Sequence, residues 1–86
     1  MKIYKYVLKL AENQAVNIHN NYKLLDIQIQ NGCICLWAIV NANEPMVNVD
    51  IVMCGTGHEL TESKKLNYIS TVQQDSYVWH FFERRT

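Results

Sequence analysis

Apolar and polar residues alternate along much of this chain with a period of two, which is the spacing typical of β-strands. In the first such segment, tyrosine and leucine recur at every second position. Six segments with this pattern, or with a short apolar run between turn residues, are predicted to be strands: 3–10, 25–30, 33–40, 47–53, 67–72 and 77–83. The polar, asparagine-rich stretch 11–23 contains Val16 and Ile18 in alternation and has room for a short edge strand.

The clearest local structure is a hairpin around Asn31-Gly32, because this pair is strongly favoured in a two-residue type I′ turn. The resulting register gives the hairpin one mixed face, on which Trp37 lies among two thiols, two amides and a carboxylate: Asp26, Gln28, Gln30, Cys33 and Cys35. The opposite face is apolar and carries Ile27, Ile29, Ile34 and Leu36. An aromatic ring among hydrogen-bonding groups can serve as a platform for a ligand.

Short strands separated by turn residues, without a long helical pattern, predict a single all-β domain over residues 1–86. We expect a small antiparallel barrel or sandwich of five to six strands. Thr56 and Glu59 have the spacing of a helix capping box, so at most one short helical turn is expected in this loop, which runs through Lys65.

Composition narrows the function classes. Eight basic residues balance eight acidic ones, which removes the strong positive field needed for broad nucleic-acid binding. The longest apolar run, residues 33–40, is far shorter than a membrane-spanning helix, and the first residues lack the apolar core of a signal peptide. We therefore expect a cytoplasmic protein that does not enter membranes, with its three cysteines as free thiols.

The strongest candidate for a site is Gly55-Thr56-Gly57-His58, directly after the predicted strand 47–53. Glycine permits positive φ and close approach to the backbone, while a hydroxyl and an imidazole can recognise polar groups. Aromatic stacking and a second imidazole can complete such a site. The predicted ligand-binding residues are Gly55, Thr56, Gly57, His58, Trp37, Trp79 and His80.

Each of these residues also has a plain structural interpretation. The glycines can serve only to end a strand, and both tryptophans lie in apolar runs where a large aromatic usually fills the core. His80 can be a hydrogen-bonded structural histidine. No serine, cysteine or carboxylate accompanies the histidines at a catalytic spacing, and Cys33-x-Cys35 is a poor match to a zinc knuckle. We expect no catalytic residues, no metal and no cofactor.

Five segments together resemble a family of small uncharacterised proteins from bacteriophages and prophages: 27–32, 36–38, 55–58, 68–71 and 78–83. The resemblance runs from Met1 to about Arg84, and its motifs are Gln-Asn-Gly with Leu-Trp-Ala, Gly-Thr-Gly-His, and Val-Trp-His. The family pattern has glycine where this chain has Ser70, which puts close backbone approach at Ser70 in doubt. The resemblance implies a phage origin and the cytoplasm of an infected host cell.

Two hypotheses about function follow for a phage accessory protein acting in counter-defence. The first is a sponge that binds and sequesters a nucleotide-like immune signal without catalysis, in a concave pocket that a homo-oligomer can complete at a subunit interface. The second is an inhibitor that binds a host defence nuclease or a CRISPR-type complex through a sheet face or edge. The first predicts a pocket, and the second predicts a flat surface.

Overall fold

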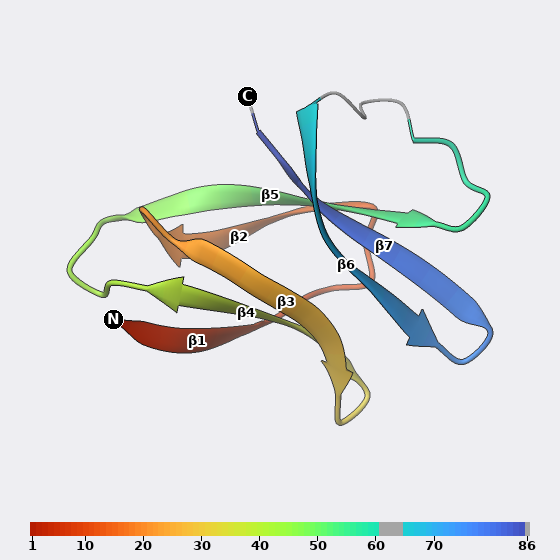
Figure 1. Ribbon diagram of the computed structural model, residues 1–86, viewed down its shortest axis with the longest axis horizontal. Coiled ribbons are helices and arrows are strands. Elements are labelled where there is room, and N and C mark those ends of the chain that lie inside the picture. Colours follow the sequence, from red (N-terminus) through yellow and green to blue (C-terminus); the bar gives the residue numbers. More distant parts are fainter. Residues whose placement is uncertain (61–64, 86) are drawn as a thin grey trace.

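Two antiparallel β-sheets face each other in this protein (Figure 1), as a computed structural model that describes residues 1–60 and 65–85 shows. The strands of the described residues are β1 (Lys2–Val7), β2 (Asn13–His19), β3 (Lys23–Gln30), β4 (Cys33–Val40), β5 (Met46–Gly55), β6 (Leu66–Gln74) and β7 (Tyr77–Arg84). None of the described residues belongs to a helix long and apolar enough to cross a membrane.

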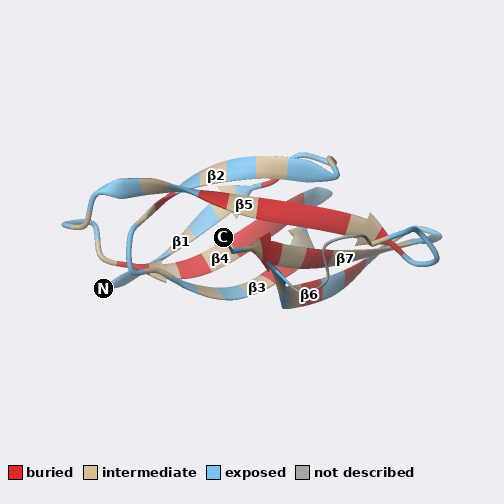
Figure 2. Cartoon of the chain, turned by 90° about the horizontal axis from the view of Figure 1, so that it is seen from above, coloured by how far each residue is buried: buried red, intermediate tan, exposed pale blue. Residues whose placement is uncertain are grey.

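One sheet has the strand order β1-β4-β3 and the other β2-β5-β7-β6, with every pairing antiparallel. Figure 2 shows the two layers, with the buried residues concentrated on the central strands β4 and β5. The sheets do not close into a barrel. The all-β prediction is confirmed in its sandwich form, with seven strands in the described part of the chain instead of five to six. The additional strand is β2, in the polar stretch.

The β3–β4 hairpin has the predicted register, with Gln28 opposite Cys35 and Asp26 opposite Trp37. Asn31 and Gly32 have φ values of 51° and 78°, as a type I′ turn requires at both positions. The mixed face is therefore confirmed and forms the outer surface of the three-stranded sheet. Lys5 Nζ reaches across β4 to donate to Gln30 Oε1 at 3.0 Å.

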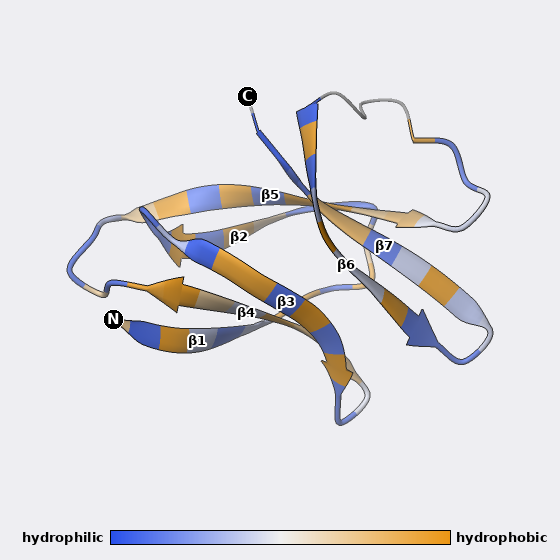
Figure 3. Cartoon of the chain, viewed as in Figure 1, coloured by the Kyte–Doolittle hydropathy of each residue, from blue (hydrophilic) through white to orange (hydrophobic). Residues whose placement is uncertain are grey.

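Hydrophobic and hydrophilic residues alternate along the strands (Figure 3). Because successive side chains of a strand point to opposite faces, the apolar ones fill the space between the sheets. The largest fully buried side chains come from both sheets and include Ile18, Ile27, Leu36, Ile51 and Phe81. Burying an aliphatic or aromatic side chain of this size contributes roughly 1.5–3 kcal/mol, so contacts between the sheets dominate the stability.

Two differences from the predicted elements concern segment ends. The first strand ends at Val7 instead of residue 10; Leu8 is buried and Leu10 is exposed. Thr56 to Leu60 form a turn and coil, so the capping-box spacing does not begin a helix within these residues. Residues 61–64 of that predicted helical turn lie outside the described residues, and Lys65 at its end has 3₁₀ geometry.

Edge strands β3 and β6, from different sheets, contact each other along one side of the sandwich. A single-residue irregularity interrupts the ladder in each of them, at Leu25 in β3 and at Ile69 in β6. Directly after the second one, buried Ser70 donates from Oγ to the carbonyl oxygen of Ile27 at 2.8 Å. The hydroxyl of Ser70 thus joins β6 to β3 at this position.

Replacing Ser70 with alanine removes the hydroxyl that joins β6 to β3. Because the Ile27 carbonyl then loses this partner in a buried place, we expect Ser70→Ala to lower the free energy of unfolding by about 1–2 kcal/mol. Chemical denaturation measures the change. Ser76→Ala, in the exposed β6–β7 turn, is the control and leaves the stability within about 0.5 kcal/mol of wild type. Equal stability of both variants contradicts the role given to Ser70.

Candidate functional site

The Gly55-Thr56-Gly57-His58 segment is a tight turn at the end of β5. The His58 amide donates to the Gly55 carbonyl oxygen at 3.0 Å, which closes the turn. Gly57 has φ of 86° at the third position of the turn, where a type II turn requires glycine. A side chain at Gly57 would meet no atom within 4 Å, so this glycine is explained by backbone conformation alone.

At Gly55 the lack of space for a side chain, and not the backbone conformation, favours glycine. It is buried and has no positive φ, but a Cβ at this position would lie 2.8 Å from His58 Nδ1 and 3.2 Å from Trp79 Cζ3. The first distance is shorter than Cβ atoms in proteins show, and the second is a tight contact that requires a small shift of the indole. The absence of a side chain at Gly55 therefore leaves room for the rings of His58 and Trp79 beside its backbone.

A pocket of about 360 Å³ opens at this place. Gly55, His58 and Trp79 line it, with polar groups from Glu12, Asn13, Glu59 and Arg84 and apolar groups from Val52, Met53, Leu60 and Leu66. Arg84 Nη2 donates to Asn13 Oδ1 at 2.9 Å, which joins β7 to the start of β2. The His58 side chain is exposed and has no hydrogen-bond partner among the described residues, so its ring nitrogens are available to a ligand.

Trp79 contributes to both the core and the pocket. It lies opposite Gly55 on β7 and packs against the core cluster. The Tyr77 ring stacks on it with centroids 5.3 Å apart, and Trp79 Nε1 donates to Gln74 Oε1 at 3.2 Å. One face and the polar edge of the indole are thus occupied within the protein. Trp79 forms a wall of the pocket, and only its remaining surface can meet a ligand.

Trp37 lies apart from this pocket. It is half-buried on the outer face of the β1-β4-β3 sheet, whereas the Gly55–His58 turn belongs to the other sheet. Trp37 does not line the pocket. The structure therefore brings Trp79, and not Trp37, to the glycine turn.

His80 and Thr56 belong to a hydrogen-bonded chain on the outer face of the four-stranded sheet. His80 Nε2 lies 2.7 Å from Thr56 Oγ1, and His80 Nδ1 lies 3.0 Å from Thr71 Oγ1. Thr71 Oγ1 in turn lies 2.7 Å from the Tyr68 hydroxyl. Both imidazole nitrogens of His80 are satisfied by hydroxyls, which agrees with a structural histidine that holds the glycine turn against β6 and β7.

The three cysteines are free thiols. Cys54 Sγ points at the carbonyl oxygens of Gly55, His58 and Glu59, at 3.5, 3.6 and 3.7 Å. In the described parts of the chain, no three histidine, cysteine, aspartate or glutamate side chains lie close enough together to hold a metal ion.

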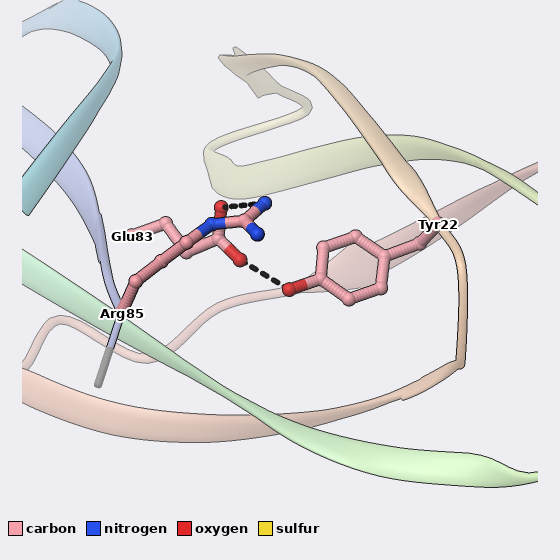
Figure 4. A network of polar contacts seen from close by, with 3 residues as sticks. All are labelled: Tyr22, Glu83 and Arg85. Atoms are coloured by element: carbon pink, nitrogen blue, oxygen red, sulfur yellow. Dashed lines mark hydrogen bonds and ion pairs between the residues drawn. The ribbon is translucent and has the colours of Figure 1, made fainter.

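A second polar cluster was missed by the sequence analysis: Tyr22, Glu83 and Arg85 (Figure 4). Glu83 is 5% exposed, although it is charged. The Tyr22 hydroxyl donates to Glu83 Oε2, and Arg85 Nη2 lies 3.2 Å from Glu83 Oε1. The period-two spacing of the strand could have predicted this burial. Glu83 follows Trp79 and Phe81 at every second position, so all three side chains face the same side of the sheet.

Comparison with known proteins identifies a family but no activity. A family model described as a domain of unknown function, DUF7352, matches residues 1–86. The chain belongs to this family. No curated protein matches it, and no solved structure does. The matched residues include all those that line the pocket, while phage origin and counter-defence stay predictions.

A methyl group at Gly55 tests whether this residue creates the approach of His58 to Trp79. We expect Gly55→Ala to lower the free energy of unfolding by about 1–3 kcal/mol, because the new Cβ overlaps the His58 ring. In a His58→Ala background the same change should cost less, with a coupling of about 1 kcal/mol in the double-mutant cycle. Strict additivity would show that the His58 ring does not rest on Gly55.

The Tyr22 hydroxyl gives the protein a predicted alkaline sensitivity. Burial, the hydrogen bond to Glu83 and the charge of Glu83 raise the pKa of Tyr22 from 10.0 to about 12, against an opposing effect of Arg85. Because the pKa is higher in the folded state, its contribution to stability is complete below pH 10 and is lost as the pH rises through 12.

We therefore expect the stability of wild type to fall between these pH values by more than that of Tyr22→Phe. Denaturant unfolding at a series of pH values measures the difference. Tyr77→Phe is the control, because Tyr77 is 59% exposed. Parallel curves for wild type and Tyr22→Phe contradict the assignment.

Proposed function

We propose that this protein is a non-catalytic binding module that holds a small planar ligand with polar or anionic groups in the pocket of Gly55, His58 and Trp79. The observation that supports it most is the exposed His58 ring, which rests over a glycine with no side chain and has no hydrogen-bond partner among the described residues. The pocket volume of about 360 Å³ is within the range of small-molecule sites, roughly 300–1,000 Å³.

The chemistry of the lining favours a nucleotide-like ligand. His58 can donate or accept a hydrogen bond, and Arg84 can bind one phosphate or carboxylate group. Glu12 and Glu59 can accept hydrogen bonds from the amino and hydroxyl groups of a base and a sugar. The edge of Trp79 and the side chains of Leu60 and Leu66 offer apolar contact to a ring. With the resemblance to phage proteins, this supports sequestration of a nucleotide-like immune signal in the cytoplasm of an infected cell as the biological role.

A second candidate function is inhibition of a host defence protein through the outer face of the β1-β4-β3 sheet. Ile3 and Val7 on edge strand β1 are 61% and 63% exposed there. They flank Lys5, which lies opposite half-buried Trp37. An exposed apolar surface on an edge strand suits contact with another protein.

Ligand-dependent thermal stability separates the two candidates. We expect one member of a panel of cyclic di- and oligonucleotides and ADP-ribose derivatives to raise the melting temperature, because binding to the folded state stabilises it. His58→Ala should weaken that ligand about tenfold, the effect of one lost hydrogen bond, with little change in the melting temperature of the free protein. Native mass spectrometry gives the stoichiometry.

Trp37→Phe is the control, since Trp37 lies outside the pocket, and it should leave the affinity unchanged. Unchanged affinity in His58→Ala would exclude His58 from binding. A panel without any thermal shift would favour the protein-inhibitor candidate, for which Ile3→Asp should abolish capture of the host partner while His58→Ala should not.

A further inference from the structure

A second cavity, also of about 360 Å³, lies where β3 begins and β7 ends. Its lining combines the polar cluster of Tyr22, Glu83 and Arg85 with Lys23 and Asn67. It shares no lining residue with the pocket of Gly55, His58 and Trp79. This cavity is therefore a separate feature of the sandwich.

The two irregularities in the edge strands border this cavity. Leu25 and Ile69, the residues at which the ladders of β3 and β6 shift register, both line it. Beyond them the Ser70–Ile27 hydrogen bond joins the two strands again. Bulges on facing edges re-aim side chains and interrupt pairing, and they are common beside functional sites.

The floor of the cavity holds a buried carboxylate. Glu83 occupies an inward position of β7, next in the alternation after fully buried Phe81, where an apolar side chain would suit the core. Replacing a buried ion pair by apolar residues is often neutral or stabilising, so the pair is not explained by stability alone. The two Glu83 oxygens accept from Tyr22 and Arg85 (Figure 4).

The two partners of Glu83 differ in how firmly they are held. Tyr22 is half-buried and packs against the core cluster. Arg85 follows the last residue of β7, and its side chain is 63% exposed against 6% for that of Glu83. Glu83 is the single partner of the Arg85 guanidinium in the described parts of the chain. The Arg85 end of this pair is open to solvent, so another guanidinium can replace it while the carboxylate stays. Because an unpaired buried carboxylate is costly, the site favours a cationic occupant.

We propose that Glu83 and Tyr22 form a site for a guanidinium group, which Arg85 occupies within the chain and which an arginine side chain of a partner polypeptide takes over by displacing Arg85. Arginine suits the site better than lysine because its planar fork matches a carboxylate, and Arg85 shows that a guanidinium can approach Glu83. Leu24, Leu25 and Ile69 provide apolar walls for the aliphatic part of the incoming side chain.

The charges around the cavity agree with a cationic occupant at its floor. Burial raises the pKa of Tyr22 most, the hydrogen bond and the charge of Glu83 raise it further, and the charge of Arg85 opposes them with a smaller effect. Lys23 adds a positive charge, but it is exposed and pairs with Ile39 on the outer face of its sheet. An anion would instead have to bind Arg85 beside a buried carboxylate.

The test uses N-acetyl-L-arginine amide as the probe, with the uncharged isostere N-acetyl-L-citrulline amide and inorganic phosphate as comparison ligands. Two-dimensional NMR of the full chain follows the amides of residues 22–25, 67–70 and 83–85 during each titration. We expect saturable shifts with the arginine probe, and none with the citrulline probe or phosphate.

Arg85→Gln removes the internal competitor and should strengthen probe binding about two- to fivefold, because the largely exposed Arg85 guanidinium no longer competes with the probe for Glu83. Glu83→Gln should abolish binding. Lys9→Gln is the matched control for Arg85→Gln, since it also removes one positive charge but at an exposed position outside the cavity. It should leave the affinity for the probe unchanged. If Glu83→Gln does not fold, the direction in which Arg85→Gln changes the affinity for the arginine probe still tests the proposal.

Three results would overturn the proposal. Weaker or unchanged binding of the probe by Arg85→Gln would show that Arg85 does not occupy the site. Phosphate shifts at the same amides that disappear in Arg85→Gln would establish an anion site. Absence of saturable shifts in both wild type and Arg85→Gln would leave the Tyr22–Glu83–Arg85 cluster as a structural contact only.

Discussion

The side chains on the inward face of β7 contribute to the core and to both pockets of this protein. β7 pairs with β5 on one side and β6 on the other, and its alternation turns Trp79, Phe81 and Glu83 toward the other sheet. These side chains stand roughly 7 Å apart along the strand, and each meets a different environment. Trp79 forms a wall of the glycine-turn pocket, Phe81 is fully buried in the core, and Glu83 forms the floor of the second cavity.

Each pocket depends on a local exception to regular strand packing. At the glycine turn, Gly55 removes a side chain from a buried position and admits the rings of His58 and Trp79. At the second cavity, the irregularities at Leu25 and Ile69 interrupt two edge strands beside a buried charge. Sequences commonly break local rules at functional sites, because a uniform apolar core offers no polar group to a ligand. The rest of the sandwich supplies the stability that these exceptions reduce.

The outer face of β7 has a different role. His80 joins the glycine turn to β6 through Thr56 and Thr71, and Arg84 joins β7 to β2 through Asn13. These contacts fix the position of the turn relative to the four-stranded sheet. His80 thus serves the site by positioning its loop, whereas His58, three residues from Gly55, is the imidazole that faces the pocket.

The sequence by itself determined the all-β class, the β3–β4 hairpin with its turn, and the glycine turn after β5, because period-two alternation and Asn-Gly or Gly-x-Gly chemistry act over a few neighbouring residues. It also contained the inward direction of Glu83, through its spacing from Phe81. Only the tertiary structure decided that Trp79 and not Trp37 meets His58, and that Tyr22 reaches Glu83 across 61 positions of sequence. Strand order and the facing of two sheets bring such residues together, and no local pattern encodes which distant strands become neighbours.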